Sequence, residues 1–389
     1  MPIINRLAEY QDEVAAWRHD LHQHPEILYD VHRTAAKVAE RLQEFGVDEV
    51  VTGLGRTGVV GVIRGKRGAG GRTVALRADM DALPLTEITG KPYASTIPGK
   101  MHACGHDGHT AMLLGAAKYL AETRNFDGTA VVVFQPAEEG GAGGKAMVED
   151  GLMERFGIDE IYGMHNMPGL DIGKFAIRPG PIMAATDEFN FTIAGRGAHA
   201  AKPHLSLDPI VIGSHLVQAM QTIVSRSVDP LDSVVVSVTK FHAGEAHNII
   251  PQTAFLGGTV RTLTPEMRDL AEKRIREIAA GIGATYGARI EVDYDRNYPV
   301  TVNHVANTIF AGDVASEIVG GDRVDREVAP MMGGEDFSYM LEKRPGAFIF
   351  IGNGDTAGLH NPAYDFNDEA LPIGASYWVR LIETSLSPA

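Results

Sequence analysis

The predicted order of strands and helices changes near residue 185 and changes back near residue 297. Before the change, strand-like runs alternate with amphipathic helical patterns, which is typical of an α/β sheet with helices on both faces. Between these positions the predicted order is strand, helix, strand, strand, helix, strand, which forms a small sheet with two helices on one side. A helix at 305–319 and a buried strand at 347–351 then resume the first pattern. This order predicts an α/β domain into which a second, α+β domain is inserted.

The chain length agrees with two domains, because 389 residues exceed what one hydrophobic core normally accommodates. We assign residues 1–184 and 297–389 to the first domain, with a mixed central sheet flanked by helices. Residues 185–296 form the inserted β-α-β-β-α-β domain. The strand-like runs early in the first domain are residues 59–64, 73–77 and 129–134.

Charge and cysteine content exclude several classes of protein. A net charge of −15 argues against nucleic acid or an anionic membrane surface as a partner. Cys104 is the single cysteine, so no internal disulfide is possible and a reducing compartment fits the chain. The first residues lack the apolar run of a signal peptide, and no apolar stretch reaches the roughly 18 residues of a membrane span. We therefore expect a cytoplasmic protein.

Four short polar stretches lie in loops or at the ends of predicted strands, and each carries residue types that bind metal ions. They are Cys104–Asp107, Glu138–Gly141, His165–Asn166 and His360–Pro362. Thiolate, imidazole and carboxylate groups are the ligands that a borderline transition metal prefers. Because open α/β sheets bind ligands at their strand ends, these stretches can converge on one crevice. One carboxylate of Glu138-Glu139 can then bind a metal ion while its neighbour acts as a base, which indicates metal-assisted hydrolysis.

Each stretch also has a simpler interpretation. A single cysteine is often a small buried hydrophobic residue, and Cys104 could instead be a nucleophile with a histidine base. The nucleophile hypothesis leaves Glu138, Glu139 and His360 without a role. A Glu-Glu pair is often a solvated turn, and a lone histidine is often only a hydrogen-bonded loop residue. Since Cys104 precedes a predicted helix at 108–122, we expect the helix dipole to favour its thiolate.

Other features lack the context that a site requires. The run Gly53–Gly58 fits a dinucleotide-binding pattern but precedes strand-like residues, so we expect a hairpin turn. His19, His22 and His24 are expected to make capping and surface contacts near a helix end. His109 lies one turn inside a helix and is expected to hydrogen-bond locally rather than to bind metal.

Four motifs together resemble those of one protein family. They are Leu76–Pro84 (LRADMDALP), Cys104–His109 (CGHDGH), Pro136–Gly140 (PAEEG) and Gly333–Phe337 (GGEDF). In these motifs, and over essentially its whole length, the chain resembles the M20 metallopeptidase family, in particular its branch of aminoacylases, hippurate hydrolases and auxin-conjugate amidohydrolases. The resemblance implies a zinc-peptidase-like catalytic domain with an inserted lid or dimerisation domain. It also implies an amidohydrolase with two divalent metal ions per subunit, Mn²⁺ or Zn²⁺, with Co²⁺ or Ni²⁺ also compatible with the donors.

The resemblance carries a metal site over to this chain residue by residue. The implied ligands are Cys104, His106, Glu139, His165 and His360. Cys104 takes the bridging place between the two ions, and Glu138 becomes the general base. Wider members of the superfamily have a His-x-Asp ligand motif where this chain has Asp79-Met80-Asp81. The role of Asp79 therefore stays open, while Asp81 is expected to orient the ligands by hydrogen bonds.

The inserted domain supplies further expected site residues. His199 is the candidate for stabilising the oxyanion of the tetrahedral intermediate, and the resemblance implies that it reaches the active site of the partner in a homodimer. Asn248 is implied to hold the scissile carbonyl or the carboxylate. Arg261 is implied to bind the carboxylate of the amino acid with its planar guanidinium group. Gly334 is a candidate backbone donor to the same group.

The leading hypothesis is hydrolysis of an N-acyl amino acid to a carboxylic acid and a free amino acid. A dipeptidase or aminopeptidase uses the same chemistry, but it needs an acidic group for the free ammonium, and the sequence identifies none. A third possibility is a non-catalytic protein that binds amino acid conjugates in a closing cleft. The presence of Glu138 together with all the implied ligands favours an enzyme.

Overall fold

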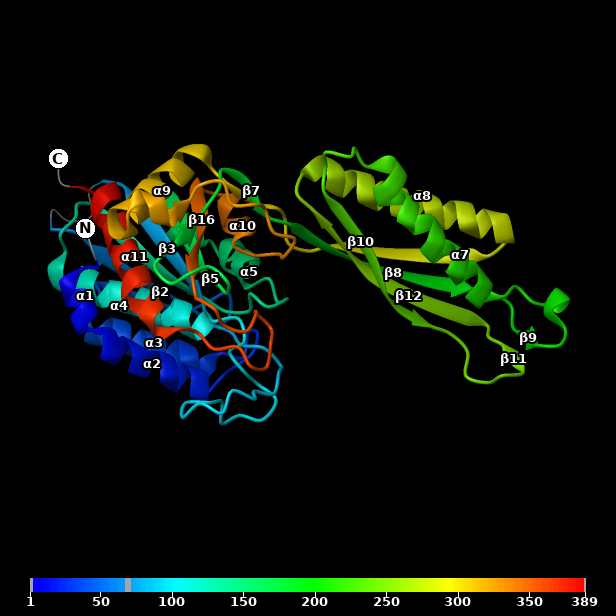
Figure 1. Cartoon of the computed structure of the whole chain (residues 1–389), viewed down its shortest axis with the longest axis horizontal. Helices are drawn as coiled ribbons and strands as arrows, with labels where there is room; N and C mark the ends of the chain where they lie inside the picture. The colour runs from blue at the N-terminus through cyan, green and yellow to red at the C-terminus, as the bar shows by residue number, and fades with distance from the viewer. Residues whose placement is uncertain (1–2, 67–70, 388–389) are drawn as a thin grey trace. The chain divides into compact units, whose positions relative to one another are not determined.

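The computed structural model describes residues 3–66 and 71–387, which divide into two compact units (Figure 1). The first unit comprises Met1–Ile182, Val302–Ala329 and Asp336–Ala389, and the second comprises Met183–Thr301 and Pro330–Glu335. Residues 330–335 were expected in the first domain. They group with the second because the Ala184 N–H donates to the carbonyl oxygens of Met331 (3.0 Å) and Gly333 (2.9 Å). This short loop has no strand or helix pattern from which the contact could be predicted.

The described part of the first unit contains an eight-stranded sheet. In spatial order its strands are β1 (Glu49–Leu54), β2 (Gly58–Arg64), β4 (Thr129–Gln135), β3 (Thr73–Asp79), β5 (Glu160–Met167), β16 (Gly346–Gly352), β6 (Phe175–Ala176) and β15 (Val324–Asp325). The neighbours β4, β3, β5 and β16 run parallel, whereas β1 and β2 pair antiparallel at one side. The predicted mixed sheet is therefore confirmed, and the run Gly53–Gly58 is the expected hairpin, since Leu54 pairs with Gly58.

Helices lie against both faces of this sheet. Those of the first unit are α1 (Asn5–Glu9), α2 (Gln11–Gln23), α3 (His32–Glu44), α4 (His106–Thr123), α5 (Gly143–Glu149), α6 (Leu152–Arg155), α9 (Val305–Val319), α10 (Ser338–Leu341) and α11 (Leu371–Ser385). Alternate strand residues such as Val132 and Ile349 join the core cluster that contains α4 and α11. On the other face, Phe348 packs against Phe337 at the start of α10, with ring centroids 5.5 Å apart. This alternation is the two-residue period of a strand buried on both sides.

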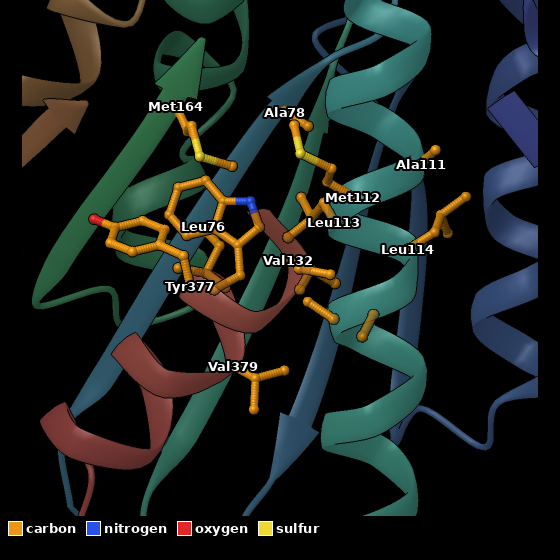
Figure 2. Close-up of a cluster of buried hydrophobic side chains, with 14 of the residues drawn as sticks. Leu76, Ala78, Ala111, Met112, Leu113, Leu114, Val132, Met164, Tyr377 and Val379 are labelled. Atoms are coloured by element: carbon orange, nitrogen blue, oxygen red, sulfur yellow. The ribbon is translucent and has the colours of Figure 1, made fainter. Parts of the chain in front are cut away.

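The core on the α4 face fixes where α4 begins. Figure 2 shows Met112 and Leu113 of α4 beside Leu76 of β3 and Val132 of β4, with Tyr377 of α11 nearby, whereas Leu114 projects from the opposite side of α4. These side chains are at most 2% exposed. Because α4 is held along most of its length, its first residue, His106, is fixed at one edge of the sheet.

The parallel strands bring four loops to that edge. Because β3, β4, β5 and β16 run in the same direction, their carboxyl ends lie together. The residues that follow or end these strands include Asp81, Glu138, His165 and His360. The topology therefore brings together polar stretches that lie far apart in the sequence.

The second unit has the predicted β-α-β-β-α-β order, with α7 and α8 against one face of its sheet (Figure 1). Its antiparallel sheet has the order β10 (Val234–His242), β12 (Thr253–Thr262), β8 (Ala185–Ala194) and β13 (Arg289–Arg296). The helices are α7 (Pro209–Thr222), continued by a π-helical segment Ile223–Ser227, and α8 (Pro265–Tyr286). A short ribbon pairs β9 (Ala198–His199) with β11 (Ile249–Ile250). The chain passes between the two units within β7 (Gly180–Met183) and β14 (Thr301–Asn303).

Among the described residues, no helix combines the length and apolar character that crossing a membrane requires.

Gly374 is required for the contact between α11 and α4, because an added Cβ would overlap the Met112 sulfur. We expect Gly374→Ala to lower the free energy of unfolding by about 1–3 kcal/mol through overpacking. Gly321, in the same unit, has open space around it, so Gly321→Ala should be neutral or stabilise by about 0.4–1 kcal/mol. Denaturant unfolding of both variants measures the difference, and equal effects would contradict the close packing at Gly374.

Candidate metal centre

Two groups of potential metal ligands in the first unit share one residue, Cys104. Within the described residues, the donor atoms of Cys104, His106 and His165 all lie within 4.8 Å of one another. The donor atoms of Cys104, Glu139 and His360 meet the same limit. The closest approach in the first group is 3.3 Å, between Cys104 Sγ and His165 Nε2. The structure thus brings together the five side chains that the sequence singles out, from four separate stretches of chain.

Backbone carbonyls fix the ring orientation of two of the histidines. His106 Nδ1 lies 2.8 Å from the carbonyl oxygen of Asp81, and His165 Nδ1 lies 2.7 Å from that of Asn166. Since a carbonyl oxygen only accepts, both rings carry their hydrogen on Nδ1. Nε2 of each ring then faces the cluster, where the neutral form of the imidazole can bind a metal ion.

Asp81 orders the Glu138-Glu139 turn. Its Oδ1 accepts the N–H of Glu138 at 3.0 Å, and its Oδ2 accepts the N–H of Glu139 at 3.1 Å. Ala137, just before this pair, has a positive φ of 55°, which an alanine adopts only when its surroundings require it. The carboxylate therefore holds both glutamates where the chain turns sharply after β4.

His360 is placed by its backbone as well as by its side chain. It has a positive φ of 59°, and its N–H donates to the carbonyl oxygen of Ala103 at 2.7 Å. Its Nε2 lies 3.2 Å from Glu139 Oε1. The hydrogen bond to Ala103 ties this exposed loop directly to the segment that carries Cys104.

The pKa of Cys104 differs from the expectation that the α4 dipole would favour its thiolate. Burial, and next the carboxylates of Glu139 and Glu138, raise the pKa of its thiol well above the ordinary value, in spite of the adjacent α4 N-terminus. Burial lowers the pKa of His106, but the surrounding carboxylates, led by Asp79, outweigh it and raise that pKa to about 10. The cluster is therefore rich in negative charge and lacks a permanent cation. A divalent ion would reverse both effects and favour the thiolate.

The donors fit divalent metal ions. In the described part of the chain, the buried atom His106 Nε2 has no hydrogen-bond partner. Such orphaned buried atoms are costly unless another group satisfies them. Sulfur, imidazole nitrogen and carboxylate oxygen are together the donor set of a borderline transition metal.

Two buried histidines beside the cluster, His22 and His109, can be compared with the sequence predictions. His22 was expected at the surface, but it is 1% exposed, and its Nδ1 lies 2.8 Å from Asp107 Oδ2. Burial lowers the pKa of His22, but Asp107 and Glu87 outweigh it and raise that pKa to about 9. The buried stripe of α2, which includes Val14 and Leu21, is the sequence signal that could have placed His22 inside. His109 was expected to hydrogen-bond locally, but its two ring nitrogens bond Asp79 and Asn166, which are distant in sequence.

The three residues expected from the inserted domain, His199, Asn248 and Arg261, lie in the second unit, and so does Gly334, which was expected in the first domain. His199 and Asn248 are exposed and adjacent, because Ala200 N–H donates to the Asn248 carbonyl oxygen at 3.0 Å. Arg261 on β12 is half-buried and pairs in register with Thr186 of β8, and burial lowers its pKa. Gly334 has no room for a side chain, since an added Cβ would overlap Thr186. Within this unit, His199 therefore lies next to Asn248, and Arg261 and Gly334 both adjoin Thr186.

Comparison with known proteins gives a consistent result. Residues 75–384 match the model of peptidase family M20/M25/M40. The chain is 44% identical to the hippurate hydrolase of Campylobacter jejuni over 98% of both proteins. It is 39% identical to an N-acetylcysteine deacetylase of Bacillus subtilis over 94% of both.

A solved structure is similar over the same extent. It is the YXEP protein of Bacillus subtilis, described as a dinuclear metal-binding peptidase of the M20 family, which matches with a TM-score of 0.84 and 34% identity. The match covers 98% of this chain and 100% of that one. With the family model matching most of its length, the chain belongs to peptidase family M20/M25/M40.

Proposed function

We propose that the protein is a metal-dependent amidohydrolase that cleaves N-acyl amino acids to a carboxylic acid and a free amino acid. The observation that carries this proposal is the pair of ligand groups that share Cys104, with the buried carboxyl of Glu138 beside them. The relatives named for hippurate and N-acetylcysteine both act on an amino acid with an acyl group on its nitrogen, which supports this substrate class.

Each proposed ligand has a place in one of the two groups. His106 and His165 would hold one ion, Glu139 and His360 would hold the other, and Cys104 would offer its sulfur to both. When bound, two divalent ions polarise the amide carbonyl and lower the pKa of a water molecule. Zn²⁺ and Mn²⁺ are the leading candidates, and Co²⁺ and Ni²⁺ suit the same donors.

Glu138 is the proposed proton carrier. It takes a proton from the attacking water and delivers it to the leaving amide nitrogen. Its position suits this task because Asp81 fixes its backbone and its side chain is only 7% exposed. Asp81 acts by positioning, since it also holds the ring of His106 through its carbonyl oxygen.

The second unit supplies the proposed substrate contacts. His199 donates a hydrogen bond to the oxyanion, and Asn248, next to it, holds the scissile carbonyl or the carboxylate. Arg261 binds the carboxylate of the amino acid, a role suited to its planar guanidinium group. Gly334 offers a backbone N–H to the same carboxylate.

A homodimer formed through the second unit is part of the proposal, with each His199 acting in the active site of the partner. Large apolar side chains exposed on this unit support such an interface. They are Leu205, Ile210, Val211, Val224, Leu231, Phe241 and Ile249. A cytoplasmic location remains a prediction.

Assays on hippurate, N-acetyl-methionine and unblocked dipeptides, together with metal analysis, test the substrate class. Cleavage of the first two but not of dipeptides supports an N-acyl amino acid hydrolase. Preference for unblocked dipeptides would favour a peptidase of the same fold. Metal binding without cleavage of any of them would favour a binding protein.

Glu138→Gln tests the proton carrier. We expect kcat to fall by about 10²–10⁴-fold while the metal content stays unchanged, because the amide cannot take up the proton. Glu149→Gln is the matched control, since this glutamate on α5 is exposed and should leave kcat unaltered. An unchanged kcat in Glu138→Gln would remove this residue as the base.

Metal stoichiometry tests the sharing of Cys104. Cys104→Ala removes a donor from both ligand groups and should weaken the binding of both ions, whereas His360→Ala should weaken only one. The measurement is the number of Zn²⁺ ions retained after dialysis against a competing chelator. Retention of two ions by Cys104→Ala would place the bridge on another residue.

Mixing two inactive variants tests the dimer. A subunit with Glu138→Gln still provides His199, and a subunit with His199→Ala still provides Glu138. If His199 acts in the partner's site, random mixed dimers contain one intact site in each heterodimer, or about one quarter of the wild-type activity. Each variant alone should stay inactive, and no recovery on mixing under conditions that exchange subunits would contradict the proposal.

A further inference from the structure

Resting on the proposed function, we propose that Asp79, His109 and Asn166 form a positioning chain that holds Cys104 and His165 in place for one of the two ions. None of the three is a proposed ligand. All are buried, with exposed fractions of 0%, 2% and 1%. The chain gives Asp79 a role that the sequence left open.

The first link joins Asp79 to His109. Asp79 Oδ1 lies 2.7 Å from His109 Nδ1, and Arg77 donates to Asp79 Oδ2 at 2.7 Å. Each carboxylate oxygen thus has its own donor. Because a carboxylate accepts, His109 carries a hydrogen on Nδ1.

The second link joins His109 to Asn166. The backbone N–H of Asn166 donates to His109 Nε2 at 2.9 Å, and the Asn166 side-chain nitrogen lies 3.1 Å from the same atom. His109 Nε2 must therefore be an acceptor, which requires the neutral ring with its hydrogen on Nδ1. Both ring nitrogens are used, so His109 has no lone pair left for a metal ion.

The third link joins Asn166 to the two proposed ligands. Its side-chain nitrogen donates to the carbonyl oxygen of Cys104 at 2.6 Å, and its own carbonyl accepts from His165 Nδ1 at 2.7 Å. The Tyr364 hydroxyl donates to Asn166 Oδ1 at 2.8 Å. Gly105 makes this approach possible, because an added Cβ there would overlap both the Asn166 amide and the Tyr364 hydroxyl.

The positioning chain favours one ligand group. Its Asn166 end reaches His165, which belongs to one group only, and the backbone of Cys104, which both groups share. Glu139 and His360 are held by different contacts, namely the Asp81 carboxylate on the Glu139 N–H and the Ala103 carbonyl on the His360 N–H. Loss of the chain should therefore weaken one ion much more than the other.

Asp79→Asn is the least disruptive variant, because it keeps the size of the side chain. An asparagine has one acceptor oxygen, so it can satisfy either Arg77 or His109 but not both. If its NH₂ faces His109, the ring hydrogen must move to Nε2, where it opposes the Asn166 N–H. Asn166→Leu removes the last link directly. Asn303→Leu is the matched control, since Asn303 is also 1% exposed and bonds backbone groups of Phe348 away from the cluster.

Titration of the metal-free protein with Zn²⁺ in the presence of a competing chelator gives the affinity for each ion. We expect Asp79→Asn and Asn166→Leu to weaken one ion by about 10–100-fold and to leave the other within about threefold. With Co²⁺ as the probe, the visible absorption of the weakened site should change while that of the other is kept. Asn303→Leu should bind both ions as the wild type does, even if its unfolding midpoint falls.

Equal weakening of both ions, or no weakening in Asp79→Asn and Asn166→Leu, would overturn the positioning chain. Binding of fewer than two ions by the wild-type protein would contradict both this inference and the proposed metal site. Two bound ions without cleavage of N-acyl amino acids would contradict only the proposed substrate class.

Discussion

The parallel direction of β4, β3, β5 and β16 is the constraint on which the proposed site depends. Parallel neighbours place all their carboxyl ends at one edge, so the loops that follow them must meet there. The Asp79–Asp81 turn, the Glu138-Glu139 pair, His165 and the His360 loop all arrive at that edge in this way. The fifth stretch, with Cys104 and His106, is brought there by α4, whose apolar length is buried against the same sheet.

Burial makes this convergence costly without a bound cation. Asp79, Asp81 and Glu138 are buried within or beside the cluster, and burial together with the charges of Glu139, Glu138 and Asp79 raises the pKa of the Cys104 thiol. Nearby hydrogen bonds offset part of the cost, because the Asp81 and Asp79 carboxylates each receive donors from the chain. The remaining donor atoms, His106 Nε2 among them, lie close enough together to hold a metal ion. The burial and negative charge that make the cluster costly also favour the binding of divalent ions.

The second unit has its own hydrophobic core. It carries proposed substrate-binding residues, whereas the first unit carries the proposed metal ligands. Alternate residues of β8, namely Phe189, Phe191 and Ile193, are buried against α7 and α8. Its proposed contacts with substrate include Arg261, whose guanidinium group binds anionic groups and does not bind metal ions. This division of tasks agrees with the composition of the two units, since the clustered potential metal ligands come almost entirely from the first.

The sequence alone determined the order of elements, the two-part organisation and the residue types of the proposed metal site. It could do so because strand and helix periodicity is local, and because ligands placed after strands meet in a parallel sheet whatever the loop details. The tertiary structure decided which nitrogen of each ring faces the cluster, the burial of His22, and the partners of Asp79. These depend on hydrogen bonds between residues that are distant in sequence, such as Asp79 with His109 and His109 with Asn166, 30 and 57 positions apart. No local pattern encodes such partners, because only the packed fold sets the distances between them.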